Sequence, residues 1–174
     1  MKKYVALLKQ VYFRKKFIHM SELKEFFESI GMKNVRTVFN SGNVIFDSNE
    51  SKECLHNFIS KMLNDHYMYD IDTFLVTMEE VKSIVNSNPY ELKRNYYNQV
   101  FICRNNFEKD LYNEFSKLDL IKDEKFKLNN GLLYWTYYKP AEHDSNILKI
   151  LSRESLKHNF TLRTIGTIKK ILMC

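Results

Sequence analysis

The pattern of apolar and polar positions changes period repeatedly along the chain, and each change marks an expected element. Short apolar runs predict strands, whereas apolar residues that recur three and four positions apart predict helices packed on a sheet. In the first half the expected elements are strands at KYVALLKQ, NVRTVF, NVIFD and DIDTFLVT, a helix over residues 21–31 capped by Ser21 and stopped by Gly31, and a helix over residues 51–66. Their order is that of the ferredoxin-like unit, in which two helices cover one face of a four-stranded antiparallel sheet.

The second half repeats this order after a connecting helix. That helix opens with a T-x-x-E capping box, Thr77 to Glu80, and is ended by Pro89. The expected elements that follow are the strand YNQVFICR, a helix capped by Asn105 and running to Leu118, the hairpin KFKLNNGLLYWTYY turned at Asn130 and Gly131, a helix over residues 145–158, the strand FTLRT and the terminal helix IGTIKKILM. The sequence therefore predicts an α+β fold of duplicated ferredoxin-like (βαββαβ) repeats with antiparallel sheets. We expect the first repeat in residues 1–77 and the second, with the connecting and C-terminal helices, in residues 78–174. The two repeats are expected to pack closely, as one compact unit.

The stretch between the second and third expected strands reads Asn40, Ser41, Gly42 and Asn43. Glycine and asparagine supply the positive φ angles that a tight hairpin turn requires, so we expect Gly42 in such a conformation. Exposed backbone N–H groups in a turn of this kind also suit an anion. Local physics favours the turn, and a binding role stays open.

Composition limits the class of protein. Hydrophobic residues make up 44% of the 174 residues, which is ordinary for a globular chain with a core. No apolar run approaches the ~18 residues of a membrane helix, so we expect no membrane contact. The three cysteines, Cys54, Cys103 and Cys174, are far apart and lack metal-ligand spacing. We therefore expect a reduced, cytoplasmic protein with no metal and no cofactor.

The positive charge is concentrated at the N-terminal end. Residues 1–36 hold seven Lys and two Arg against three Glu, which equals the net charge of +6 for the whole chain. The densest point is Arg14, Lys15 and Lys16, between the first expected strand and the first helix. Such a basic loop suits an anion, although a solvated loop that keeps the protein soluble is the commoner explanation.

Three strands of the sequence allow more than one interpretation. The strands YVALL, VFIC and LLYWTYY are apolar on both faces, so something covers the second face of each sheet. Either the other repeat or the extra helices cover it, or Tyr134 and Trp135 form an exposed platform for stacking RNA bases.

Glu142, His143 and Asp144 gather acid and base groups, but adjacent side chains rarely converge on one substrate atom. Cys103, in an apolar strand, is expected to be an inert core thiol.

Several stretches together resemble a bacterial protein family, the domain of unknown function 1697. They are YVALLK, MSELKEFFESIGMKNVRTVFNSGNVIF, NPY and FTLRTIGTIKKIL, and the similarity covers essentially the whole chain. The resemblance implies a duplicated ferredoxin-like arrangement and no established activity. Relatives usually carry a glycine-rich stretch, R-G-I-N-V-G-G-K-N, where this chain has KQVYFRKKF. If that loop cradles a phosphate in relatives, then either the side chains of Lys9, Arg14, Lys15 or Lys16 replace its backbone amides here, or the site has been lost. The family's terminal T-x-R-N becomes TLRT, which keeps Arg163 as an anion contact.

We therefore expect a non-catalytic binding module for a phosphate-bearing ligand, either a nucleotide or RNA. The expected contacts are Lys9, Arg14, Lys15, Lys16, Asn40, Ser41, Gly42, Asn43 and Arg163. The alternatives are an enzyme of unknown reaction with a cleft between the two repeats, or a structural protein that binds a protein partner. Concentrated basic charge and scattered acid-base groups favour the binding module.

Overall fold

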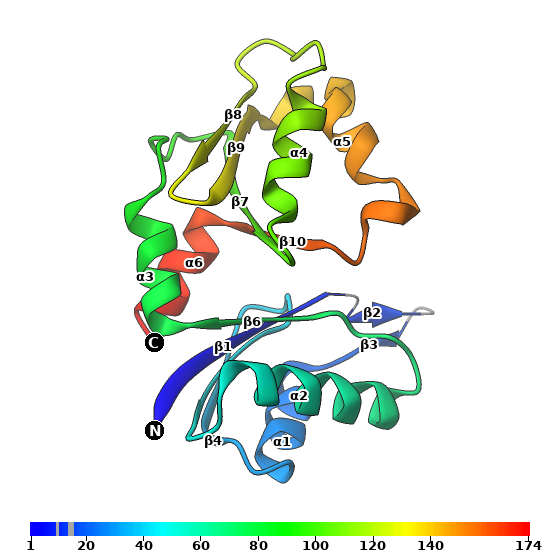
Figure 1. The fold of residues 1–174 in the computed structure, drawn as a ribbon, viewed down its shortest axis with the longest axis vertical. Coiled ribbons are helices and arrows are strands. Elements are labelled where there is room, and N and C mark those ends of the chain that lie inside the picture. The colour runs from blue at the N-terminus through cyan, green and yellow to red at the C-terminus, as the bar shows by residue number, and fades with distance from the viewer. Residues whose placement is uncertain (10, 14–15) are drawn as a thin grey trace. The chain divides into compact units, whose positions relative to one another are not determined.

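The protein consists of two compact units (Figure 1). A computed structural model describes residues 1–9, 11–13 and 16–174. The first unit comprises Met1–Lys82 and Lys170–Cys174, and the second comprises Ser83–Lys169. Each contains one four-stranded sheet whose paired strands are all antiparallel, so the predicted α+β class and antiparallel sheets are confirmed. Within the described part of the chain, no helix has the length and hydropathy needed to cross a membrane.

The sheet of the first unit has the strand order β4-β5-β1-β6. Its strands are β1 (Lys2–Leu8), β4 (Lys33–Val38), β5 (Asn43–Ser48) and β6 (Thr73–Thr77). The first strand lies inside the sheet, where Leu7 pairs with Asn43 of β5 and with Phe74 of β6. Because β1 is covered on both faces, its run YVALL is fully buried rather than alternating.

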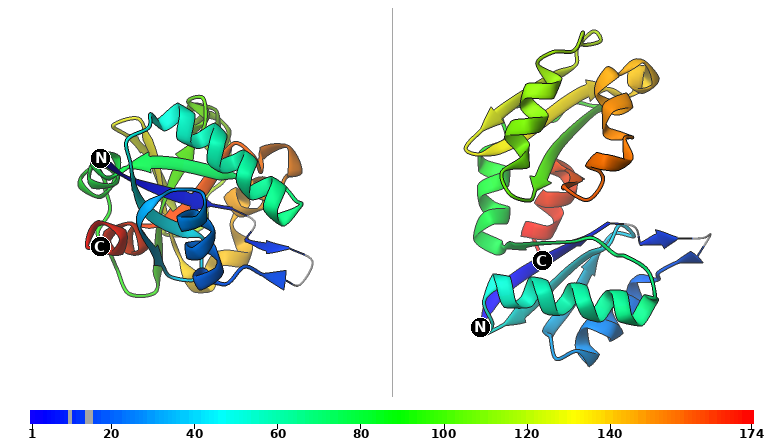
Figure 2. Two further views of the ribbon diagram at one scale, coloured as in Figure 1. Left: turned by 90° about the horizontal axis from the view of Figure 1, so that it is seen from below. Right: turned by 45° about the vertical axis from the view of Figure 1, so that its right-hand side comes forward.

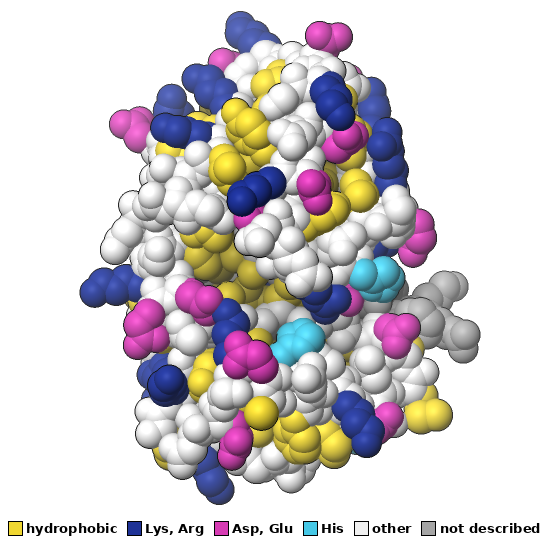
Figure 3. All heavy atoms as spheres, viewed as in Figure 1, with side chains coloured by type: hydrophobic (Ala, Val, Ile, Leu, Met, Phe, Trp, Pro, Cys, Tyr) yellow, Lys and Arg dark blue, Asp and Glu magenta, His cyan; other side chains and the backbone are white. Residues whose placement is uncertain are grey.

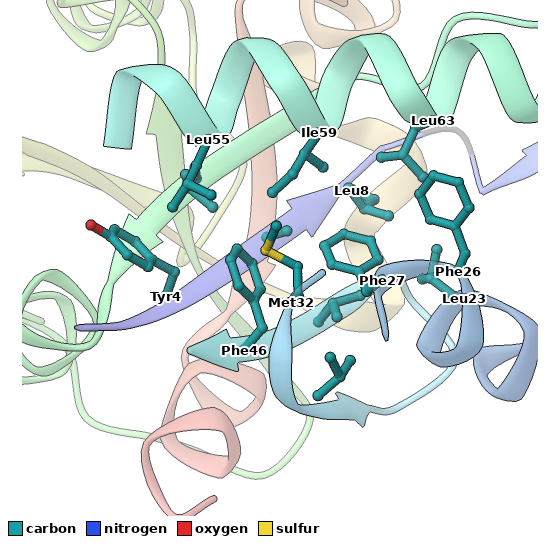
Figure 4. Packing of buried hydrophobic residues seen from close by; sticks show 14 of the residues in the cluster. Tyr4, Leu8, Leu23, Phe26, Phe27, Met32, Phe46, Leu55, Ile59 and Leu63 are labelled. Atoms are coloured by element: carbon teal, nitrogen blue, oxygen red, sulfur yellow. The ribbon is translucent and has the colours of Figure 1, made fainter. Parts of the chain in front are cut away.

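Two helices cover one face of this sheet, α1 (Met20–Ser29) and α2 (Lys52–Tyr67), as the right-hand view of Figure 2 shows. Leu55, Ile59 and Leu63 project from α2 toward the strands at helical spacing (Figure 4). They meet a cluster that includes Phe27 of α1 and Phe46 of β5. This apolar layer fixes the position of β1 and of the loops at its end.

A short antiparallel hairpin follows β1, formed by β2 (Tyr12–Phe13) and β3 (Lys16–Phe17). The sequence indicated only a loop here, because strands of two residues are too short to show a period. The backbone of Lys16 lies in β3, paired with Phe13. Arg14 and Lys15 lie outside the described residues.

The sheet of the second unit has the strand order β10-β7-β9-β8. Its strands are β7 (Tyr96–Cys103), β8 (Lys125–Asn129), β9 (Leu132–Tyr138) and β10 (Phe160–Thr164). Helices α4 (Phe107–Phe115) and α5 (Asn146–Leu151) pack on one face over an aromatic core. In that core Phe101 contacts the rings of Phe115 and Trp135. The predicted turn is confirmed, with φ of 49° at Asn130 and 72° at Gly131.

The remaining helices are α3 (Met78–Asn86), α6 (Ile165–Leu172) and two 3-10 turns, η1 (Lys139–Asp144) and η2 (Glu154–Leu156). The capping box of α3 is confirmed: the Thr77 N–H donates to Glu80 Oε2 at 2.7 Å, and the Glu80 N–H donates to Thr77 Oγ1 at 3.1 Å. The Tyr134 hydroxyl donates to the Ile84 carbonyl at 2.8 Å.

Three predicted helices have wrong ends. Helix α1 begins at Met20, and its N-cap is His19 rather than Ser21. Helix α4 follows Asn106, which has φ of 58° and makes no side-chain cap, and it ends at Phe115 rather than Leu118. Helix α5 ends at Leu151, because the Ser152 hydroxyl donates to the Lys149 carbonyl and the backbone becomes extended at Arg153.

Candidate functional site

The end of β1 brings three loop segments of the first unit together. The Leu8 N–H donates to the Gly42 carbonyl at 2.7 Å, and the Lys9 N–H donates to the Asp72 carbonyl at 2.8 Å. These bonds continue the sheet ladder one residue beyond the strand on both sides. Lys9, which is half-buried, is therefore held between the turn after β4 and the residue before β6. We call this place the β1 end.

Gly42 has φ of +70°, so the predicted positive φ is confirmed. The structure adds a second requirement that the sequence did not show. A Cβ at Gly42 would lie 2.8 Å from Val11 Cγ1, 3.0 Å from Leu8 Cβ and 3.1 Å from the Leu8 carbonyl oxygen. The turn is therefore packed directly against the chain that follows β1, and only glycine permits the approach.

Asn43 is fully buried, at 0% exposure. Its Nδ2 donates to the Val38 carbonyl and to Ser41 Oγ, both at 2.9 Å. These two bonds tie the start of β5 to the end of β4 and fix the shape of the turn between them. The neighbouring Asn40 and Ser41 are exposed and available to solvent. Asn43 thus positions the turn, while Asn40 and Ser41 face outward.

Arg163 belongs to the second unit, on β10. Its Nη1 donates to Thr161 Oγ1 at 2.7 Å and to the Leu162 carbonyl at 2.8 Å. Burial lowers the pKa of Arg163 to about 10. Its guanidinium therefore bonds to its own strand. The predicted binding residues of the N-terminal half, by contrast, all belong to the first unit.

Two residues at the β1 end were missed by the sequence analysis. Phe39 was expected to continue its strand, but β4 stops at Val38 and Phe39 has φ of 54° and is 56% exposed. The apolar pattern did not indicate this exposed, positive-φ residue, because an aromatic side chain at the end of a strand is usually buried. Asp72 is 8% exposed and is attached through its carbonyl to Lys9. Its burial depends on tertiary packing.

The aromatic platform for RNA bases was a wrong prediction. Tyr134 and Trp135 are each 0% exposed, and the Trp135 ring stacks on Tyr137 at 4.2 Å between ring centroids. Trp135 faces the helices of its own unit. Base stacking requires an accessible ring face, which these residues do not offer.

The surface charges over the described residues are mixed in sign on the face shown in Figure 3, where basic and acidic side chains are interspersed. In the described part of the chain, no group of three His, Cys, Asp or Glu residues is arranged to hold a metal ion. Glu142, His143 and Asp144 are consecutive residues at the end of η1.

The three cysteines are free thiols in different surroundings. Burial raises the pKa of Cys103 to about 12, with a smaller contribution from Glu108, whereas Cys54 is exposed at the start of α2. The thiolate is the nucleophile, so Cys103 stays protonated and unreactive at all pH values below its raised pKa.

We therefore expect alkylation at pH 8 to modify Cys54 first and Cys103 last, as measured by peptide mass spectrometry over time. In the urea-unfolded chain the rates of the cysteines should converge. Equal rates for Cys54 and Cys103 in the folded protein would contradict the burial of Cys103.

These features define an α+β protein with two four-stranded antiparallel sheets and a structured, partly basic sheet end. A family model described as a protein of unknown function, DUF1697, matches residues 1–134. The match covers well over half of the chain, so the chain belongs to this family, and the resemblance predicted from its motifs is confirmed.

No curated protein matches the chain. Among solved structures, it is similar to the conserved bacterial protein SP0830 from Streptococcus pneumoniae, with 20% sequence identity and a TM-score of 0.83. The similarity covers 100% of this chain and 99% of that chain. At this level of identity the likeness concerns the fold alone.

Proposed function

We propose that the protein is a non-catalytic binding module for a phosphate-bearing ligand, a nucleotide or RNA, held at the β1 end. The observation that carries this proposal is the pair of backbone bonds that fix Leu8 and Lys9 between Gly42 and Asp72. The bond from Leu8, the neighbour of Lys9, goes to the turn that contains the exposed Asn40 and Ser41, and Lys9 precedes in sequence the segment that contains Arg14, Lys15 and Lys16.

The charge distribution supports an anionic ligand. The net charge of +6 is accounted for by residues 1–36, so the rest of the chain contributes no net attraction for a polyanion. Asn40 and Ser41 supply neutral donors, and the fixed turn limits the entropy lost when they order around a phosphate. Asp72 opposes an anion at the same place, but its side chain is largely turned from solvent. Arg163, the remaining expected contact, belongs to the second unit and donates to Thr161 and Leu162 of its own strand.

We also propose that the two units are ferredoxin-like repeats derived by duplication, with the boundary between residues 77 and 78. Within each unit, the strand that comes first, β1 or β7, lies between the last strand and the second strand of the hairpin. Two helices follow the first and third strands in both units. Superposing the four strands and two helices of one unit on those of the other checks this; a mismatch in strand order or direction contradicts it. A cytoplasmic location is part of the same proposal, since the three cysteines are free.

The binding proposal predicts a salt-dependent affinity that depends on the basic segment. Labelled single-stranded RNA and a nucleotide panel are titrated at about 50 mM and about 200 mM salt, where contacts to phosphates lose affinity steeply through counterion release. Replacing Arg14, Lys15 and Lys16 together by Gln should weaken binding and flatten the salt dependence. Stability should change by less than ~0.5 kcal/mol if these side chains contact the ligand rather than the core.

A matched control removes the same charge elsewhere. Lys109, Lys122 and Lys127 are exposed in the second unit, and replacing them by Gln should leave most of the affinity and its salt slope unchanged. The proposal fails if no ligand binds at about 50 mM salt, where even non-specific binding is evident. It also fails if the control triple variant loses as much affinity as the basic-segment variant.

A further inference from the structure

The second unit contains a polar cavity of about 260 Å³ that the proposed function does not use. Pro89 and Tyr90 form one wall, in the segment that follows α3, while Tyr96 of β7 and Thr136 of β9 belong to the sheet. Its volume is just below the ~300–1,000 Å³ of pockets for drug-sized ligands, so it suits a smaller molecule. The N-P-Y motif that contributes to the family resemblance therefore builds a cavity wall.

Tyr90 is fastened to the sheet by its backbone. The Tyr90 carbonyl accepts from Asn88 Nδ2 at 2.7 Å and from Asn98 Nδ2 at 3.2 Å, and the Tyr90 N–H donates to Asn88 Oδ1 at 3.4 Å. The asparagine of the motif thus closes a local turn, and Asn98 of β7 ties that turn to the strand. Burial raises the pKa of Tyr90 to about 12, which keeps its phenol neutral. The wall is rigid and uncharged.

A row of polar residues crosses the three strands beside this wall. Asn98 lies opposite Thr136, and Thr136 lies opposite Lys125, so the three share one face of the sheet. Asn98 is 5% exposed, and its Oδ1 has no hydrogen-bond partner among the described residues. Asn98 is not one of the residues that line the cavity; its contribution is to hold the Tyr90 carbonyl through Nδ2.

Charges of both signs line the cavity. Lys93 and Lys125 contribute two ammonium groups, and Glu91 and Asp123 contribute two carboxylates. In the part of the chain that the structure describes, none of these four residues forms an ion pair with another. The Tyr96 hydroxyl donates to Asp123 Oδ2 at 3.4 Å, which orients that carboxylate at the rim. A ligand with one positive and one negative group satisfies both sets at once.

We propose that this cavity binds a free α-amino acid. Its ammonium group pairs with Glu91 or Asp123, and its carboxylate pairs with Lys93 and Lys125. The rings of Tyr90 and Tyr96 add cation–π attraction for the ammonium group. Inorganic anions satisfy only the lysines, and simple amines satisfy only the carboxylates. The structure therefore assigns a zwitterion-binding site to the second unit, independent of the β1 end.

The test is an NMR titration of the ¹⁵N-labelled full chain with glycine, phenylalanine, glutamate and lysine up to about 10 mM. We expect saturable shifts of the backbone amides of Tyr90, Tyr96 and Thr136 with at least one amino acid. The N-acetyl and the amide derivatives of that amino acid each lack one charge and should bind about tenfold more weakly, a loss of about 1.4 kcal/mol. Inorganic phosphate and the neutral osmolyte glycerol serve as further probes.

Two variants locate the site. Lys125→Gln and Asp123→Asn should each weaken binding about tenfold. Asparagine tolerates the φ of 64° at position 123, so the backbone is preserved. The controls are Lys127→Gln, two residues along the same strand, and Asp119→Asn, in the preceding loop; both should bind as the unchanged chain does. Dispersed NMR spectra of all four variants verify that they fold.

Three results overturn the proposal. The first is the absence of amino-acid shifts at about 10 mM. The second is equal binding by the N-acetyl or amide derivatives, or by phosphate alone, which means that only one charge is recognised. The third is an equal loss of affinity in the Lys127→Gln or Asp119→Asn controls, which means that the shifts arise elsewhere on the unit.

Discussion

Gly42→Ala should lower the free energy of unfolding by about 2–4 kcal/mol, because two costs add at this position. A left-handed backbone costs an L-residue about 1–2 kcal/mol, and the φ of +70° is in that region. A Cβ also meets Val11 Cγ1 at 2.8 Å and the Leu8 backbone at 3.1 Å, so the β1 end must shift. Urea unfolding followed by circular dichroism measures the change.

Gly131 separates these two costs. Its φ is +72°, but a Cβ there meets no atom within 4 Å, so Gly131→Ala should cost only about 1 kcal/mol. Asparagine adopts positive φ more readily than other residues. Gly131→Asn should therefore be nearly neutral, whereas Gly42→Asn should remain strongly destabilising. If Gly42→Asn restores most of the stability, the close approach to Leu8 and Val11 is not the cause.

Gly42 also shows which features of the fold can be predicted from the sequence. The dipeptide pattern around Gly42 and Gly131 predicted both turns, because positive φ is a local requirement that few residues meet. The capping box at Thr77 and Glu80 was predicted for the same reason, since its partners are three residues apart. Apolar periods located all eight strands of the two sheets.

The features that the sequence did not predict depend on side chains that compete for backbone hydrogen bonds, or on tertiary contacts. The end of α5 is set by the Ser152 hydroxyl, which takes the Lys149 carbonyl that a continuing helix would use. The burial of Asn43 depends on the Val38 carbonyl and the Ser41 hydroxyl, which only the folded hairpin brings to it. Trp135 was offered as a base platform because its strand is apolar on both faces, and a strand pattern does not tell which face is open.

The two candidate sites also differ in whether they could be predicted from the sequence. Lys9, Asn40 and Ser41 were named from charge and turn chemistry; the structure shows that Leu8, next to Lys9, bonds to Gly42 of the turn. The cavity beside Tyr90 was not predicted. It needs Thr136 of β9 and Lys125 of β8 to lie opposite one another, and this register is known only from the folded sheet.

Glu124→Ala should destabilise the second unit by about 3 kcal/mol. Glu124 is 4% exposed, and its Oε1 accepts from Trp135 Nε1 at 3.0 Å and from Ser145 Oγ at 2.6 Å. Its Oε2 accepts from the Ile121 N–H at 3.2 Å. Trp135 and Ser145 are both 0% exposed, so removal of the carboxylate leaves two buried donors without acceptors, each costing about 1–3 kcal/mol.

The single tryptophan of the chain makes this change directly observable, because its indole N–H is one of the donors. Urea unfolding followed by tryptophan fluorescence gives the loss of stability and reports solvent entry around Trp135. The control is Asp119→Ala, an exposed acidic residue of the same loop, which should change stability by less than ~0.5 kcal/mol.

Glu124→Gln tests whether acceptors or charge stabilise this network. Glutamine keeps one oxygen for Trp135 and Ser145 and loses the acceptor for Ile121, so its cost should be about 1 kcal/mol, well below that of alanine. If glutamine costs as much as alanine, the ionised carboxylate itself is required and the count of hydrogen bonds does not explain the stability. An intermediate value shows that Glu124 joins the loop, β9 and the start of α5 by accepting hydrogen bonds from all three.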